Sequence, residues 1–195
     1  MSAILSPDGL YRYELRRDIA GIFSPTPLFV VIGLNPSTAD ATEDDPTIRR
    51  CVGFARREGC GELVMLNLYA LRATDPDALI DTIAHPNMRP EYAIRWAAVG
   101  PDNDDTIAAV VREVREHGGI IVAAWGSTHA RLTEDRVAAV MDALCLCTEE
   151  ATAQDPHDAR CPVPHVRCLG TTKDGHPRHP LYLRADAPLV PWSPR

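Results

Sequence analysis

The sequence has few aromatic residues, no surplus of positive charge and no apolar run long enough to span a membrane. Phe, Trp and Tyr make up 6% of its 195 residues, and 20 Lys and Arg stand against 27 Asp and Glu, which gives a net charge of −7. A protein that grips duplex DNA regardless of sequence needs surplus basic side chains. The charge balance therefore restricts any nucleic-acid contact to local sites, and no transmembrane helix or membrane partner is expected.

The N-terminal residues do not combine a basic region with a following apolar region, so the sequence predicts no secretory signal and, by default, a cytoplasmic location. Six cysteines in such a chain are expected to be reduced thiols rather than a disulfide framework. The length is suited to a single domain over residues 1–195.

A group of cysteines near the C-terminal third of the chain is the only candidate metal site in the sequence. It comprises Cys145, Cys147, Cys161 and Cys168. Four such thiolates suffice for a structural zinc, but their spacing fits no standard zinc motif. We therefore expect buried thiols and a surface loop, with no metal and no cofactor; a zinc site and a disulfide between loop cysteines are the alternatives.

Apolar segments of buried-strand type alternate with segments of helical periodicity. The expected strands are residues 28–34, 63–68, 120–124 and 166–169, and the expected helices are residues 46–58, 105–117 and 131–144. This alternation predicts an α/β fold, a three-layer sandwich with a four-stranded, mostly parallel central sheet and helices on both faces. Residues 11–17 are interpreted as a charged edge strand, and residues 147–165 as an irregular excursion.

Two of the expected strands end at an asparagine. The first ends in Gly33, Leu34, Asn35, Pro36 and Ser37, and the second ends at Asn67. Ligands bind at the carboxyl edge of open α/β sheets, so both amides are candidates for a binding site. A plain alternative for Asn35 is a turn, because Asn-Pro often opens one.

A short loop near the C-terminus concentrates imidazole, guanidinium and proline rings. It holds His176, Arg178 and His179 between and beside two prolines. Proline fixes the backbone, so the loop is predicted to be rigid and to present groups that can donate to an anion. Such a loop is suited to stabilise a developing negative charge.

An acidic loop precedes the first expected helix and contains Asp40, Asp44 and Asp45. Asp45 is the expected N-cap, Pro46 occupies the first turn, and Gly59 ends the helix. Acids in this position are more often caps than catalysts.

The strings 35–40, 44–51 and 172–177 resemble those of a bacterial and phage family catalogued only as a domain of unknown function, and this resemblance covers most of the chain. More distantly, residues 33–37, 66–74 and 179–181 resemble, in the same order, the motifs of the uracil-DNA glycosylase superfamily. The distant resemblance implies a glycosylase-like fold and the release of a modified or mismatched base, as in DNA repair or modified-base processing; a shared fold with different chemistry is the alternative.

The glycosylase resemblance gives each candidate residue a role. Asn35 would orient a water, assisted by Asp40, Asp44 or Asp45, and His179 or His176 would donate to the departing base. Asn67 matches a pyrimidine edge, and Phe54 or Tyr69 would form an aromatic floor for an extruded base. The remaining expected contacts are Gly33, Leu34, Pro36 and Ser37 in the pocket, Leu181 or Tyr182 in the vacated stack, and Lys173, Arg178 and Arg49 on phosphates.

The expected partner is DNA, single-stranded or distorted, or a nucleotide, because extrusion of a base costs least where pairing is already lost. Two other functions are open at this point. One is a non-catalytic nucleotide or nucleic-acid binding module, and the other is a hydrolase or transferase acting on a small phosphorylated metabolite, which an acidic protein suits. Phe54 also falls on the apolar face of its helix, and Trp125 follows a strand, so both have a plain interpretation as packing residues.

Overall fold

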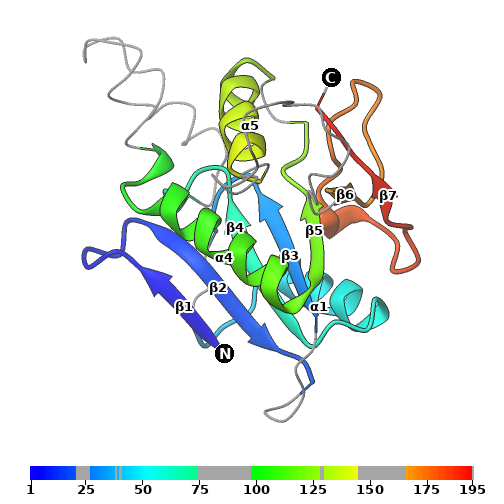
Figure 1. Cartoon of the computed structure of the whole chain (residues 1–195), viewed down its shortest axis with the longest axis horizontal. Coiled ribbons are helices and arrows are strands. Elements are labelled where there is room, and N and C mark those ends of the chain that lie inside the picture. The colour runs from blue at the N-terminus through cyan, green and yellow to red at the C-terminus, as the bar shows by residue number, and fades with distance from the viewer. Residues whose placement is uncertain are drawn as a thin grey trace.

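The computed structural model describes residues 1–20, 27–37, 39, 41–73, 98–127, 130–144 and 166–194. Within them a seven-stranded sheet runs through the molecule in the order β1-β2-β4-β3-β5-β6-β7 (Figure 1). The strands are β1 Ser2–Leu5, β2 Arg12–Asp18, β3 Leu28–Gly33, β4 Glu62–Asn67, β5 Gly119–Ala123, β6 Arg167–Cys168 and β7 Val190–Pro191.

The four central strands β4, β3, β5 and β6 are mutually parallel, and they coincide with the four strands expected from the sequence. The whole sheet is wider and mixed, because β1 and β2 add antiparallel strands at one edge and β7 adds one at the other. The expectation of four strands was therefore too low. The additional outer strands β1 and β7 have four and two residues, too short to give a periodic signal.

Helices cover both faces of the sheet, which confirms the three layers. They are α1 Pro46–Arg57, α4 Asn103–His117 and α5 Ala130–Leu144, with a 3₁₀ turn η1 Pro180–Tyr182. In β3, Phe29 and Val31 join the apolar cluster under α1, whereas Val30 and Ile32 join the cluster under α4 and α5. Figure 1 shows α4 crossing the near face of the strands. Alternate strand residues thus serve opposite cores, as a parallel sheet buried on both faces requires.

The boundaries of α1 follow from its caps, as predicted. The Asp45 carboxylate accepts a hydrogen bond from the Ile48 amide at 2.8 Å, and Pro46 occupies the first helical position. Gly59 follows the helix with a φ of 71°, a left-handed conformation that glycine adopts without strain. The helix therefore starts at a defined place, directly beside the ends of the parallel strands.

The charged strand β2 is an inner strand, which corrects the expectation of an edge. It pairs with β1 on one side and β4 on the other. Three of its charged residues, Arg12, Glu14 and Arg17, are buried: Arg17 is 1% exposed and its Nε lies 2.6 Å from Asp44. Arg16 forms ion pairs with Glu14, Glu62 and Glu113. A run of charges can therefore occupy an inner strand when each charge meets a partner.

Among the described residues, no helix combines the length and apolarity that crossing a bilayer requires. The expected excursion at residues 147–165 lies outside the described residues.

The Arg17–Asp44 ion pair gives a test of the buried charge. Asp44→Ala is expected to lower the free energy of unfolding by about 2–4 kcal/mol, because it leaves a buried guanidinium without its carboxylate. Asp186→Ala removes a similar contact from Arg184, whose side chain is 86% exposed, and is expected to cost less than about 0.5 kcal/mol. Urea denaturation of both variants measures the difference, and equal losses would contradict the structural role of Asp44.

Candidate functional site

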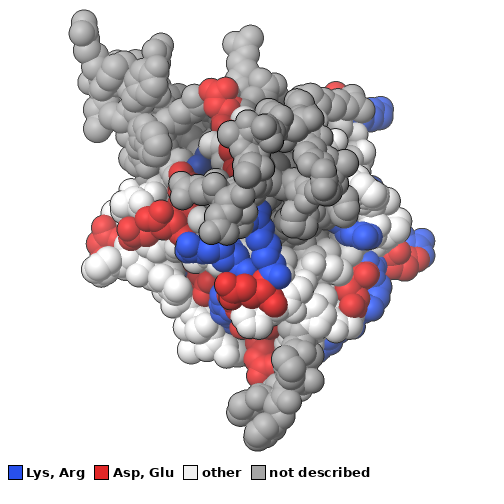
Figure 2. All heavy atoms as spheres, viewed as in Figure 1, with Lys and Arg blue, Asp and Glu red and all other residues white. Residues whose placement is uncertain are grey.

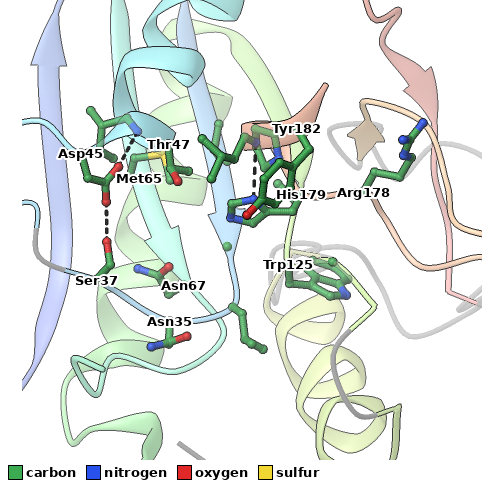
Figure 3. A pocket seen from close by; sticks show the side chains of 18 of the residues that line it. Asn35, Ser37, Asp45, Thr47, Met65, Asn67, Trp125, Arg178, His179 and Tyr182 are labelled. Carbon is green, nitrogen blue, oxygen red and sulfur yellow. Dashed lines mark hydrogen bonds between the residues drawn. The ribbon is translucent and has the colours of Figure 1, made fainter. Parts of the chain in front are cut away.

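A pocket of about 570 Å³ opens at the carboxyl ends of β3, β4 and β5 and is closed on one side by the loop that leads into η1. Figure 3 shows the side chains that converge there. The predicted residues that line it are Gly33, Leu34, Asn35, Ser37, Asp45, Asn67, Arg178, His179, Leu181 and Tyr182. The volume is in the range of small-molecule sites, and the position at the strand ends is where α/β sheets bind ligands.

Asn35 is held by the backbone in a single orientation. Its Nδ2 donates to the carbonyl oxygens of Ala73 at 2.9 Å and of Pro36 at 3.2 Å. Both amide hydrogens are therefore engaged, and Oδ1 is the atom left to accept a hydrogen bond in the pocket. This group can orient a water or a ligand donor, but an amide is a poor base.

Asn67 presents the opposite character, that of a donor. It ends β4, is 2% exposed, and its buried Nδ2 has no hydrogen-bond partner within the described residues. An unsatisfied buried donor costs about 1–3 kcal/mol, which a bound acceptor would remove. Gly33 pairs with Asn67 in the sheet register, and a Cβ at Gly33 would lie 2.9 Å from Asn67 Oδ1. Glycine is thus required at position 33 for the Asn67 side chain to occupy its place.

The backbone beneath Asn67 is anchored by two side chains that the sequence did not suggest. Asn103 Nδ2 donates to the carbonyls of Asn67 at 3.1 Å and Leu68 at 3.2 Å. Arg136 Nε donates to the same Leu68 carbonyl at 2.6 Å, and its guanidinium also pairs with Asp104. The two helices α4 and α5 therefore fix the end of β4. This role cannot be predicted from a local sequence motif, because Asn103 and Arg136 lie far from Asn67 in the chain.

His179 enters the pocket wall as the N-cap of η1. Its Nδ1 accepts a hydrogen bond from the Leu181 amide at 3.4 Å, so the neutral ring carries its proton on Nε2. Burial lowers the pKa of His179 below its ordinary value, and the negative charge of Asp45 opposes this only in part. A neutral donor in a partly desolvated wall is the result.

The three acids of the loop that precedes α1, Asp40, Asp44 and Asp45, differ in their contacts and in what the structure describes of them. Both oxygens of Asp45 are occupied, one by the Ile48 amide and one by the Ser37 hydroxyl, so this pocket carboxylate is first a structural cap. Asp44 is not among the pocket residues and pairs with Arg17. Asp40 lies outside the described residues. Of the acids that the structure describes, Asp45 is the one that contributes charge to the pocket.

Neither residue expected as an aromatic floor lines the pocket. Phe54 is buried in the core under α1, where the guanidinium groups of Arg50 and Arg57 lie over its ring, and Tyr69 is buried in the core under α4 and α5. Both rings are buried in the apolar cores, so the structure does not place them in the pocket wall.

Four further expected contacts also fall outside the lining. They are Pro36, Arg49, Lys173 and His176. Arg49 donates to the Asp44 carbonyl, Lys173 is exposed in a turn, and the His176 amide bonds to Thr172 Oγ1 at 3.2 Å. Each belongs to the surface or the loop framework around the pocket rather than to its wall.

Several lining residues had no assigned role or only a packing role. Arg12 is 3% exposed and donates to the Ala39 carbonyl at 2.6 Å, so a buried guanidinium forms part of the wall. Trp125 packs edge-to-face on Trp192 at 5.0 Å, as expected for a packing residue, and also lines the pocket. Thr172 completes the side formed by the C-terminal loop, next to Tyr182, which the sequence analysis had expected as an alternative to Leu181 in the vacated stack. The charges of the strand that contains Arg12 indicated an edge strand, so the sequence did not suggest that Arg12 lines a pocket.

Of the cysteines in the candidate zinc cluster, the structure describes Cys168, which is a buried free thiol. Cys145, Cys147 and Cys161 lie outside the described residues. Within the described ranges, no three His, Cys, Asp or Glu side chains gather as metal ligands. Burial, aided by Asp45, raises the pKa of the Cys51 thiol to about 12, so this cysteine near the pocket stays protonated and unreactive.

Residues 12–181 match a family described as a protein of unknown function, DUF1643. The chain belongs to the DUF1643 family. Neither the curated proteins nor the solved structures give a significant match. The DUF1643 match begins at the start of β2 and ends inside η1, so it includes every parallel strand and the loop that carries His179.

The close fit of Asn67 against Gly33 can be tested by adding one methyl group. Gly33→Ala is expected to displace the Asn67 side chain, to shift its side-chain amide NMR signals, and to lower the free energy of unfolding by about 1–2 kcal/mol. Gly53→Ala is the matched control, since a Cβ there meets no atom within 4 Å and alanine favours a helix interior by about 0.5–1 kcal/mol. Unchanged Asn67 signals in Gly33→Ala would show that the contact is not restrictive.

Burial of His179 predicts the direction of its titration. Its folded pKa lies below the ordinary value of 6.5, so the folded protein favours the neutral ring. The resulting stability is present above the unfolded pKa and is lost as the pH falls toward the folded pKa. An NMR titration, with the resonance assigned through His179→Gln, is expected to give a midpoint below 6.5; a midpoint at or above this value would contradict the desolvated environment.

Proposed function

We propose that the protein hydrolyses an N-glycosidic bond in DNA or a nucleotide and releases a modified or mismatched base. The observation that carries the proposal is that one pocket combines Asn67, a buried donor without a partner among the described residues, with Asn35, which retains only an acceptor, and the desolvated His179. The resemblance of residues 33–37, 66–74 and 179–181 to glycosylase motifs supports the same chemistry.

Each group has a task that follows from its hydrogen-bonding state. Cleavage breaks the bond between the sugar C1′ and the base, and the electron pair leaves with the base as an anion. The proton on His179 Nε2 can donate to an anionic base oxygen, and Asn67 Nδ2 can donate to a base carbonyl. Asn35 Oδ1 can accept from the attacking water, whose oxygen bonds to C1′ while its proton passes to solvent or the base.

The negative charge of Asp45 fits the electrostatics of this reaction. The sugar becomes oxocarbenium-like in the transition state, so a nearby carboxylate stabilises it even when its oxygens already accept hydrogen bonds. Asp45 in this role is an electrostatic group that also positions α1 and Ser37. Removal of its charge would therefore affect both the fold and the reaction.

Single-stranded or distorted DNA is the polymer that suits this surface. On the face shown in Figure 2, basic and acidic side chains of the described residues are interspersed in small groups rather than gathered into a broad basic surface. With a net charge of −7, the protein has little electrostatic energy to offset base extrusion from a matched duplex.

A hydrolase or transferase acting on a small phosphorylated metabolite is the second candidate. The buried Arg12 guanidinium in the pocket wall favours it, because a desolvated cation suits a ligand that brings its own anion into the pocket. A non-catalytic binding module would use the same contacts without turning over its ligand.

Asn35→Ala and His179→Ala are each expected to reduce base release by at least about 100-fold, because each removes a group that acts on the reacting atoms. His176→Ala is the matched control in the same loop, since His176 does not line the pocket, and is expected to retain activity. Free base released from modified oligonucleotides and mononucleotides is measured by chromatography at fixed salt, beside urea denaturation to verify the fold.

Four outcomes would redirect the proposal. Release that survives both substitutions would contradict the roles of Asn35 and His179. Turnover of mononucleotides alone would place the protein in metabolite chemistry, and tight DNA binding without release would favour a binding module. Loss of activity in His176→Ala to the same extent as in His179→Ala would place the important feature in the loop backbone rather than in the imidazole.

A further inference from the structure

An exposed tyrosine stands at the rim of the pocket. Tyr182 is 84% exposed and lines the opening. Three other large apolar side chains of the described residues are also well exposed, namely Met1, Ile4 and Leu10, and none of them lines the pocket. Single exposed apolar side chains are common on protein surfaces. Of these four, Tyr182 is the one at the pocket, where its ring is accessible to a ligand.

The ring is presented by a rigid turn. Pro180 fixes the first position of η1, His179 caps the turn, and the Leu183 amide donates back to the Pro180 carbonyl at 3.1 Å. Pro180 and Leu183 on either side are buried, so the segment is anchored at both ends. The His179 and Tyr182 rings lie 6.5 Å apart. Little backbone freedom is lost when a ligand contacts Tyr182, which raises the value of the contact.

Besides the Tyr182 ring, the C-terminal loop presents the Arg178 guanidinium on the outer side of the pocket. Arg178 is exposed, and its backbone is held by a hydrogen bond from its amide to the Gly170 carbonyl at 3.0 Å. In Figure 3 its guanidinium points away from Asn35 and Asn67. It is therefore placed for a group outside the pocket rather than for the part of a ligand that enters it.

We propose that Tyr182 is a stacking platform for the nucleobase next to the one that enters the pocket, with Arg178 contacting the backbone phosphate beside it. The ligand is then a single-stranded nucleic acid rather than a mononucleotide. This inference rests on the proposed function only in that a nucleobase occupies the pocket, and it holds for a binding module as well as for a glycosylase.

Single-stranded ligands fit these two residues for a physical reason. A base in a duplex already stacks on both neighbours, so it must be unstacked before it can cover a tyrosine ring. A base in a flexible single strand has a free face, and stacking on an aromatic side chain is independent of its identity. Binding through one aromatic ring and one guanidinium does not require a broad basic surface, and this suits a protein with a net charge of −7.

The test compares a short single-stranded oligo(dU) that carries one 2-aminopurine with deoxyuridine monophosphate. The oligonucleotide is expected to bind at least about 10-fold more tightly, and its 2-aminopurine fluorescence is expected to fall on binding as the base stacks. Tyr182→Ala is expected to weaken oligonucleotide binding by about 5- to 100-fold, more than it weakens mononucleotide binding, and to remove the quenching.

Two control variants separate stacking from other effects. Tyr182→Phe keeps an aromatic face and is expected to retain both affinity and quenching, whereas Leu10→Ala removes an exposed apolar side chain away from the pocket and is expected to change neither. Arg178→Ala is expected to weaken the oligonucleotide and to reduce the salt dependence of its binding.

The inference is overturned by equal affinity for the two ligands, by a Tyr182→Ala variant that weakens both equally, or by failure of the oligonucleotide to bind. Base release measured in the same samples distinguishes this from failure of the proposed function. Binding that depends on Tyr182 but is not followed by base release would support the stacking role of Tyr182 and contradict the glycosylase function. Base release that is equally efficient from the mononucleotide and independent of Tyr182 would support the glycosylase function and contradict the stacking role.

Discussion

The pocket depends on the parallel pairing of β3 with β4 in a register that sets Gly33 opposite Asn67. The pairing continues past the strands, because the amides of Leu68 and Tyr69 donate to the carbonyls of Gly33 and Leu34, each at 2.9 Å. A shift by one residue would replace the glycine by a side chain and turn Asn67 to the other face of the sheet. The position of Asn67 against Gly33 in the pocket follows from this one register.

The sequence allowed the parallel centre of the sheet and the start of α1 to be predicted, because both rest on local signals. Buried parallel strands are continuous apolar runs, and the Asp45–Pro46 start is a local cap. The expected convergence of Asn35, Asn67 and the His179 loop also followed from topology alone, since parallel strands deliver their carboxyl ends to one edge.

The parts that escaped prediction depend on which way a side chain points at the end of an element. Phe54 and Tyr69 have the right chemistry for a base floor, but the packing of α1 and of the opposite core buries them elsewhere. The strand that contains Arg12 was expected at the edge of the sheet, because burial of its charges depends on partners distant in sequence. Asn103 and Arg136 act through the backbone of β4 and leave no motif.

The order of the site residues along the chain has a consequence for biosynthesis. Asn35 and Asn67 belong to the first half of the protein, whereas His179 follows β6, the last parallel strand. A nascent chain emerging from the ribosome can pair β3 with β4 long before the imidazole has been made. Both amides are thus synthesised before the histidine that lines the same pocket. Completion of the pocket coincides with completion of the sheet, so a truncated product that lacks the last strands would carry the two amides without His179.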